Sequence, residues 1–269
     1  MNLHKDMHVI YETPTIELVE IPSQFMLSSL FTLLFILYIS AMVYTNRRYK
    51  RWPIQRTIFW ALGILCAIVA VAGPLANRSH SDFTVHMVSH LLLGMIAPLL
   101  MAAAAPMTLL LRTVSTRTAR MFSWLLRSWL SRIYTHPFVA TTLNIGGLWL
   151  LYTTELYSLM HDNSLMYLIV HLHIFITGYL FTISMIYFDP IMHRKSLQYR
   201  MIFLILALAG HGILSKYIYA HPPIGVPLEQ AEIGSKLMYY GGDIIDAALI
   251  FLLCMQWYKS VRTRTLTLQ

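Results

Sequence analysis

The sequence predicts an all-α integral membrane protein with seven transmembrane helices, its N-terminus outside the cell and its C-terminus in the cytoplasm. Three observations support this fold class. Of the 269 residues, 57% are hydrophobic and only 12% are charged, whereas soluble domains average about 25% charged residues. Apolar runs of about 20 residues recur, each long enough to cross about 30 Å of hydrocarbon as a helix. Lysine and arginine gather in alternate connecting segments.

The seven expected spans follow one another through short connections. They cover residues 25–45, 56–73, 86–111, 136–156, 166–188, 199–219 and 238–258. The third span contains Pro98 and Pro106, which free backbone carbonyls that a neighbouring helix must satisfy. Glycines interrupt the last two spans at positions 210, 212, 241 and 242. We expect an extracytoplasmic segment over 1–24, a transmembrane domain over 25–258 and a cytoplasmic tail over 259–269.

The orientation comes from the basic residues. Sixteen of the twenty lie between spans one and two, three and four, and five and six, or after span seven. The remaining four are Lys5, Arg78, Lys216 and Lys236. Because short cytoplasmic segments carry the excess of Lys and Arg, this alternation places the N-terminus outside.

The same distribution excludes a nucleic-acid partner, since the net charge of +8 is divided among the membrane-flanking segments. The first 24 residues are polar and the basic cluster follows the first apolar run, so we expect no cleavable signal peptide. The two cysteines, Cys66 and Cys254, stand alone in different spans. They fit packing positions better than a disulfide or a thiol clip.

Two connecting segments have a distinct composition. Residues 112–135 alternate Trp, Leu, Phe and Met with arginines, which predicts amphipathic helix lying flat in the cytoplasmic interface. Residues 220–237 contain three prolines and Gly225. We expect this outer segment to be too irregular for a long helix and to form an ordered lid or docking loop.

Histidines are distributed unequally between the two sides of the membrane. Under the predicted topology only His136 and His193 lie on the cytoplasmic side. The other ten lie outside or in the outer half of the bilayer: His4, His8, His80, His86, His90, His161, His171, His173, His211 and His221. Those outside the spans, namely His4, His8, His80, His161 and His221, are expected to be solvated. An ionisable side chain inside a span is a functional candidate.

The pair His86 and His90 is the first candidate for a metal site. Residues four apart share one helix face, about 6 Å apart along the axis. Met87 lies three residues before His90 and offers a thioether to the same face. Imidazole and thioether together suit Cu(I), whereas zinc more often recruits thiolate or carboxylate. We therefore expect copper.

Other spans bring further polar residues to a similar depth. His171 and His173 are two apart and point nearly oppositely, so at most one of them should face a shared site; His211 comes from the sixth span. Asp243 and Asp246 are three apart on the seventh span and could orient metal-bound imidazoles. The competing interpretation is that each of these histidines forms an interhelical hydrogen bond and that the aspartates are counter-ions to Lys216.

Several of these residues stand in a pattern that resembles the CtaG-type cytochrome c oxidase assembly factors. The pattern comprises His86-Met-Val-Ser-His90, Ala97-Pro98-Leu99-Leu100, Ala105-Pro106, His173, Gly178-Tyr-Leu-Phe181, Phe188-Asp189-Pro190, His211 and Gly241-Gly242-Asp243. It covers roughly residues 60–258. The resemblance implies a seven-helix protein, and it ranks His173 level with His171 as a site residue. The outer segment departs from the family pattern, reading Glu229-Gln230-Ala-Glu-Ile-Gly234-Ser.

The resemblance and the residues together predict a non-enzymatic assembly factor for a haem–copper cytochrome c oxidase in a bacterial plasma membrane. Its partners would be oxidase subunits, and it would present copper from the outward-facing histidines. Three alternatives stay open: a b-type haem electron carrier with bis-His ligation, a copper or proton transporter, and a metal-free scaffold for oxidase subunits. The inner halves of the spans offer few polar residues, which disfavours the transporter.

Overall fold

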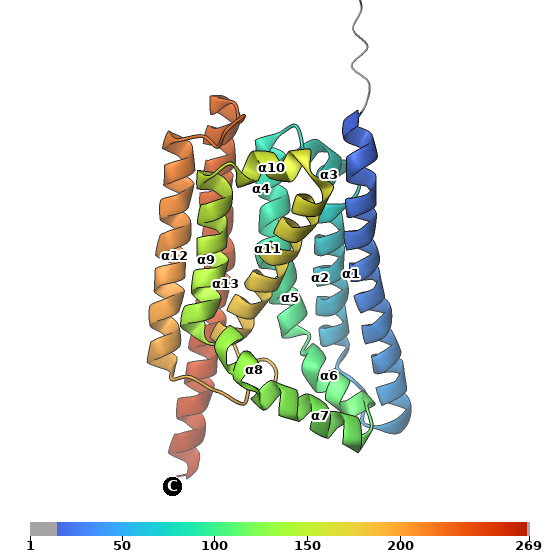
Figure 1. Ribbon diagram of the computed structural model, residues 1–269. Helices are drawn as coiled ribbons and strands as arrows, with labels where there is room; N and C mark the ends of the chain where they lie inside the picture. Colours follow the sequence, from blue (N-terminus) through green and yellow to red (C-terminus); the bar gives the residue numbers. More distant parts are fainter. Residues whose placement is uncertain (1–14, 268–269) are drawn as a thin grey trace, which may run out of the picture.

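The structure, a computed structural model, describes the backbone of residues 15–267 and the side chains of residues 23–262. His4 and His8, with residues 1–14 of the expected N-terminal segment, lie outside the described residues. Figure 1 shows a bundle of long helices with shorter ones at both ends. Its elements are α1 (Thr15–Arg48), α2 (Ile54–Val71), α3 (Pro74–Ser79), α4 (Phe83–Leu91), the π-helical η1 (Leu92–Ile96), α5 (Ala97–Ala103), α6 (Pro106–Thr113), α7 (Thr116–Arg127), α8 (Trp129–Tyr134), α9 (Pro137–Thr153), α10 (Leu156–Asp162), α11 (Ser164–Met185), α12 (Leu197–Ala220) and α13 (Leu228–Thr267).

Six segments of the described chain are long and apolar enough to cross a membrane. They are Ser23–Arg48, Ile54–Val71, Phe83–Ala103, Ser164–Met185, Leu197–Ala220 and Leu228–Arg262. The span expected over 136–156 is the helix α9, whose 17 residues extend only about 25 Å at 1.5 Å per residue. It is therefore shorter than the hydrocarbon core of about 30 Å. The all-helical membrane class is confirmed, while the count of seven spans stays a prediction.

The bundle is arranged so that α4, η1 and α5 are enclosed by other helices. The helix α13 packs against α4 and α12, α11 packs against η1, α5 and α9, and α2 packs against α5 and α1. In Figure 1, α1 and α12 stand at opposite edges. Large apolar side chains such as Leu33, Ile205 and Phe251 are more than half exposed on the outer wall. A wall of this composition fits hydrocarbon better than water.

The last helix is longer than the sequence suggested. The segment 220–237 was expected to be irregular throughout. Only residues 221–227 are non-helical, because α13 begins at Leu228. The physical reason is that proline constrains itself and the residue before it, and the last of the three prolines is Pro227. Its carbonyl already accepts the amide of Ala231 in the first turn. The prediction of a long irregular outer loop was wrong.

The third span is not a uniform α-helix. Pro98 has no amide hydrogen for the carbonyl of Gly94, and its ring crowds that carbonyl. The chain responds with the π-helical turn η1, in which the amide of Ala97 donates to the carbonyl of Leu92, five residues earlier. Gly178 of α11 lies directly against the Gly94 carbonyl, where a Cβ would collide with the oxygen. The bulge and the close approach of α11 therefore depend on each other.

The same span, expected to be continuous over 86–111, breaks after Ala103. Ala105 has φ 51°, in the left-handed region, and Pro106 starts α6. The Asp189 carboxylate accepts hydrogen bonds from the amides of Met107 (3.1 Å) and Thr108 (2.8 Å). A carboxylate at a helix N-terminus satisfies amides that have no partner within the helix. This cap explains why the chain can restart a helix immediately after the break.

The amphipathic segment predicted over 112–135 forms α7 and α8, which run across one end of the bundle (Figure 1). Trp124 and Trp129 are exposed by 72% and 68%. Exposed indole rings next to arginines are typical of a helix that lies in a membrane interface.

We expect Gly178→Ala to disrupt the bulge, because its Cβ would meet backbone, which cannot rotate away as a side chain can. The expected loss is about 1–3 kcal/mol, the usual range for overpacking. Gly146→Ala in α9 is the matched control, since nothing in the described part of the chain lies within 4 Å of a Cβ there. It should be neutral or stabilising by up to about 1 kcal/mol. Thermal unfolding in detergent measures both, and equal midpoints would contradict the proposed role of Gly178.

Candidate functional site

His86 and His90 share one face of α4, as their spacing predicted, and that face points toward α9. The ring of Tyr152 lies 6.0 Å from the His86 ring and 6.2 Å from the His90 ring, centroid to centroid. The Tyr152 hydroxyl and His86 Nε2 form a 3.1 Å hydrogen bond. His86 therefore has a protein partner, and the two imidazoles differ in their availability to a ligand.

His211 of α12 approaches His90 from the other side. The two rings lie 6.2 Å apart with an interplanar angle of 24°. Gly242 of α13 makes room for this ring, because a Cβ at Gly242 would stand 2.5 Å from Cε1 of His211. Two helices that the sequence separates by more than a hundred residues thus bring their imidazoles together.

Neither nitrogen of His90 has a hydrogen-bond partner within the described part of the chain, and His211 Nε2 also lacks one. Both residues are about 95% buried. A buried polar atom without a partner costs free energy, and such atoms are rare in native proteins. These nitrogens are therefore the strongest sign in the structure that a ligand or water belongs beside them.

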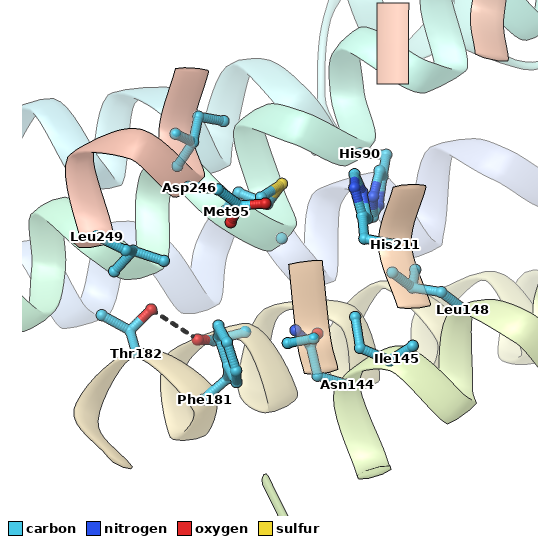
Figure 2. Close-up of a pocket in the computed structure, with 14 residues that line it drawn as sticks. His90, Met95, Asn144, Ile145, Leu148, Phe181, Thr182, His211, Asp246 and Leu249 are labelled. Carbon is cyan, nitrogen blue, oxygen red and sulfur yellow. Dashed lines mark hydrogen bonds between the residues drawn. The ribbon is translucent and has the colours of Figure 1, made fainter. Parts of the chain in front are cut away.

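A small cavity of about 30 Å³ lies next to this pair. Its lining includes His90, Met95, His211 and Asp246, which Figure 2 shows around one space. A cavity needs only about 10–15 Å³ to hold a water molecule. The space is therefore sufficient for a single ion or one or two waters, and far too small for an organic cofactor.

Met95 is the residue of this site that sequence reasoning missed. In an α-helix, a residue five positions on lies about 140° around the axis, so Met95 should not share a face with His90. In the π turn of η1 the backbone hydrogen bonds join residues five apart, which changes the direction of the side chains that follow His90. Met95 therefore lines the same cavity as His90. The available signal was Pro98 placed four residues after Gly94, which marks a possible bulge.

Met87, the thioether predicted for the site, lies elsewhere. It is fully buried and packs toward α13, where a Cβ at Gly234 would come within 3.3 Å of its Cγ. The physical reason is that positions three apart on a helix still differ by about 60° in direction. At this depth α13 packs against the face of α4 that carries Met87.

His171 and His173 point in different directions, as expected for residues two apart. His171 is buried, stacks on Tyr167 at 3.8 Å, and its Nδ1 donates to the Tyr167 carbonyl (2.8 Å). His173 is exposed, and its Nε2 lies 3.3 Å from the Leu143 carbonyl. It packs over Gly147 of α9, where a Cβ would overlap its ring. Neither ring lines the cavity beside His90.

Asp243 and Asp246 were expected to act together. The structure brings only Asp246 into the bundle, where it is 5% exposed and lines the cavity with His90 and His211. Asp243 is exposed. A rotation of about 60° between positions three apart is enough to separate the two carboxylates.

His80 and His161 form a second group nearer the end of the bundle. Their rings are 5.4 Å apart, and the His161 ring lies 6.2 Å from that of His86. Together with Tyr157 they line an open pocket of about 220 Å³. The prediction that both are solvated fails for His80, whose ring nitrogens are buried, whereas His161 is partly exposed and lines the open pocket. Burial, and then the nearby His161, lower the pKa of His80 to about 4, so its ring is neutral at physiological pH.

The predicted shell of several histidines around one metal is not assembled. Within residues 23–262, no three His, Cys, Asp or Glu side chains are grouped so as to hold a metal ion. The imidazoles are instead arranged in succession, from His161 and His80 through His86 to His90 and His211. This spacing fits a path along which an ion could move, with a two-imidazole site formed by His90 and His211 at its inner end, better than a closed structural metal site.

Comparisons with known proteins agree with the residue pattern. Uncharacterised proteins of Mycobacterium leprae and Mycobacterium bovis are 25% and 26% identical to the chain over 160 residues. The match covers 57% of this chain and 24% of each relative, so the chain spans about a quarter of the relatives' length. No solved structure matches. The sequence family described as cytochrome c oxidase caa3 assembly factor (Caa3_CtaG) matches residues 36–260, and the chain belongs to this family.

Proposed function

We propose that the protein supports the assembly of a caa3-type cytochrome c oxidase by holding Cu(I) in the cavity beside His90 and His211 and passing it to an oxidase subunit. Family membership carries the assembly role. The copper role is supported by one observation above all: two buried imidazoles line a cavity that Met95 also lines. Within the described residues, both nitrogens of His90 and Nε2 of His211 have no hydrogen-bond partner.

The donor set favours Cu(I) over other metals. Neutral imidazole and methionine thioether are soft or borderline ligands that Cu(I) accepts at low coordination number. Each nitrogen lies at its ring's edge, so rings centred 6.2 Å apart can both reach one ion at about 2 Å after small rotations. Copper is the cargo in this proposal, and a shell of few ligands allows it to leave.

The second group, His80 and His161, gives copper a route from the surface to the cavity. His80 and His161 line the open pocket, and the His161 ring lies 6.2 Å from the His86 ring. The Tyr152 ring is close to both His86 (6.0 Å) and His90 (6.2 Å). An ion could therefore exchange one imidazole for the next without crossing an apolar stretch. The hydrogen bond between His86 Nε2 and the Tyr152 hydroxyl occupies one nitrogen of His86, which suits His86 to brief passage of the ion better than to holding it.

The proposal includes a topology. Seven spans with α9 as the shortest, an extracytoplasmic segment over 1–24, a transmembrane part over 25–258 and a cytoplasmic tail over 259–269 agree with the sixteen-to-four division of basic residues. In a bacterial plasma membrane this orientation opens the His80–His161 pocket to the outside. The protein would contact oxidase subunits within the bilayer, without catalytic turnover of its own.

The alternative of a haem electron carrier is disfavoured because the cavity is too small for a porphyrin. Pockets that hold drug-sized or larger ligands measure about 300–1,000 Å³, and the cavity between His90 and His211 measures about 30 Å³. A porphyrin would have to separate α4 from α12 to be ligated by both imidazoles.

We expect purified wild-type protein to bind one Cu(I) under a competing chelator. His90→Ala, His211→Ala and Met95→Leu should each weaken binding, the two histidine variants by more than about 100-fold, because even losing an outer partner of a ligand costs 10–100-fold. His173→Ala is the matched control, since it removes an imidazole of the same bundle that lies outside the cavity. Binding that survives His90→Ala would leave a metal-free scaffold as the better account.

In cells, His90→Ala and His211→Ala should abolish most oxidase activity while the protein still accumulates in the membrane. His193→Ala, near the opposite end of the bundle, should leave oxidase activity close to that of the wild type. The measurement is oxidase activity per amount of immunodetected assembly factor. Equal losses in all three variants would argue against a localised site.

A further inference from the structure

A second polar site lies on the outer wall of the bundle, between α12 and α13. It is an open groove of about 300 Å³, lined by Ser215, Lys216 and Tyr219 of α12 and by Ser235, Lys236 and Tyr239 of α13. We call it the lysine groove. It shares no lining residue with the cavity beside His90.

The two lysines are held by crossed contacts. The Lys216 ammonium lies 5.3 Å from the centre of the Tyr239 ring, and the Lys236 ammonium lies 5.2 Å from that of Tyr219. Each contact joins the two helices and orients a cation over the groove. Among residues 23–262 neither ammonium forms a salt bridge, so both positive charges are available to a ligand.

The base of the groove offers a hydroxyl group. Ser215 is 1% exposed, and its Oγ has no hydrogen-bond partner in the described structure. A helical serine normally donates to a carbonyl three or four residues earlier, as Ser235 does to Glu232 (3.0 Å). A buried hydroxyl without a partner in the described structure, in the lining of a groove that also carries two ammonium groups, is suited to donate to an anionic oxygen.

The surroundings of the groove are those of a lipid-facing wall. Ile213, Ile233 and Ile244 on the same two helices are exposed by 58%, 49% and 74%. Tyr219 and Tyr240 are exposed as well, and tyrosine is enriched where a bilayer meets water. Figure 1 shows α12 at the edge of the bundle, with α13 as its neighbour.

We propose that the lysine groove binds the phosphate headgroup of an anionic phospholipid. Lys216 and Lys236 neutralise the phosphate, Ser215 donates to one of its oxygens, and the acyl chains lie along the exposed isoleucines. Basic pockets between membrane helices are a recognised way to hold anionic headgroups. A headgroup at this position would join α12 to α13 near the end of the bundle that carries the His80–His161 pocket.

The test compares charge removed at the groove with charge removed elsewhere. Delipidated protein is titrated with phosphatidylglycerol or with a zwitterionic phospholipid, and bound lipid is counted by native mass spectrometry. The wild type should bind phosphatidylglycerol preferentially. The double variant Lys216→Gln/Lys236→Gln should bind it about 30-fold more weakly. This change follows because each lysine near a membrane surface usually contributes a similar share to the affinity for anionic lipid. Lys50→Gln/Arg51→Gln, with the same loss of charge at two exposed positions far from the groove, should bind as the wild type does.

Further arms identify the ligand. Ser215→Ala should weaken phosphatidylglycerol binding without unfolding the protein, and His90→Ala should leave it unchanged, which separates this site from the copper proposal. Inorganic phosphate should not displace the lipid. The inference is overturned if both charge variants lose binding equally, if the two lipids bind alike, or if inorganic phosphate competes fully, which would indicate a site for a free anion.

Discussion

The arrangement of the site depends on the missing amide hydrogen of Pro98. Without it the Gly94 carbonyl has no partner at the usual position in the helix, and the chain forms a π turn over Leu92–Ile96. The absence of a side chain at Gly178 lets α11 press against that carbonyl. As a result Met95 shares the cavity with His90 and His211. One covalent feature of the backbone thus sets the position of Met95 relative to His90.

The second constraint is the burial of imidazoles that the protein itself does not satisfy. His86 and His171 both have hydrogen-bond partners within the bundle, whereas His90 has none and His211 Nε2 has none within the described residues. Burial disfavours a charged imidazole and favours the neutral ring that binds metals. The outer His80 and His161 stand where exchange with an external donor is possible. Together they form a graded series, from open pocket to enclosed cavity, in a family that assembles an oxidase.

Much of the fold followed from patterns that sequence displays directly. Hydropathy located six of the spans, and the i, i+4 rule placed His86 and His90 on one face. Convergence of His90 with His211 was also expected from their similar depth. Met95 could not be found, because its position depends on a change of helical period that the α-helical rule excludes. Met87 and Asp243 do not line the cavity for a related reason: a residue three positions away shares a face only loosely, and the neighbouring helices decide which side of that face is enclosed. The early start of α13 at Leu228 was missed because the prolines before it indicated an irregular segment. The glycines at positions 241 and 242 make room for Leu91 and His211 and do not end the helix.

Coordination of one Cu(I) by Met95 and the imidazoles of His90 and His211 is measured by X-ray absorption at the copper edge on the loaded protein. We expect nitrogen scatterers together with one sulfur at about 2.3 Å, the length usual for metal–sulfur bonds in proteins. In Met95→Leu the sulfur contribution should vanish while the nitrogen contribution remains. A wild-type spectrum without sulfur, or a sulfur contribution that persists in Met95→Leu, would contradict it.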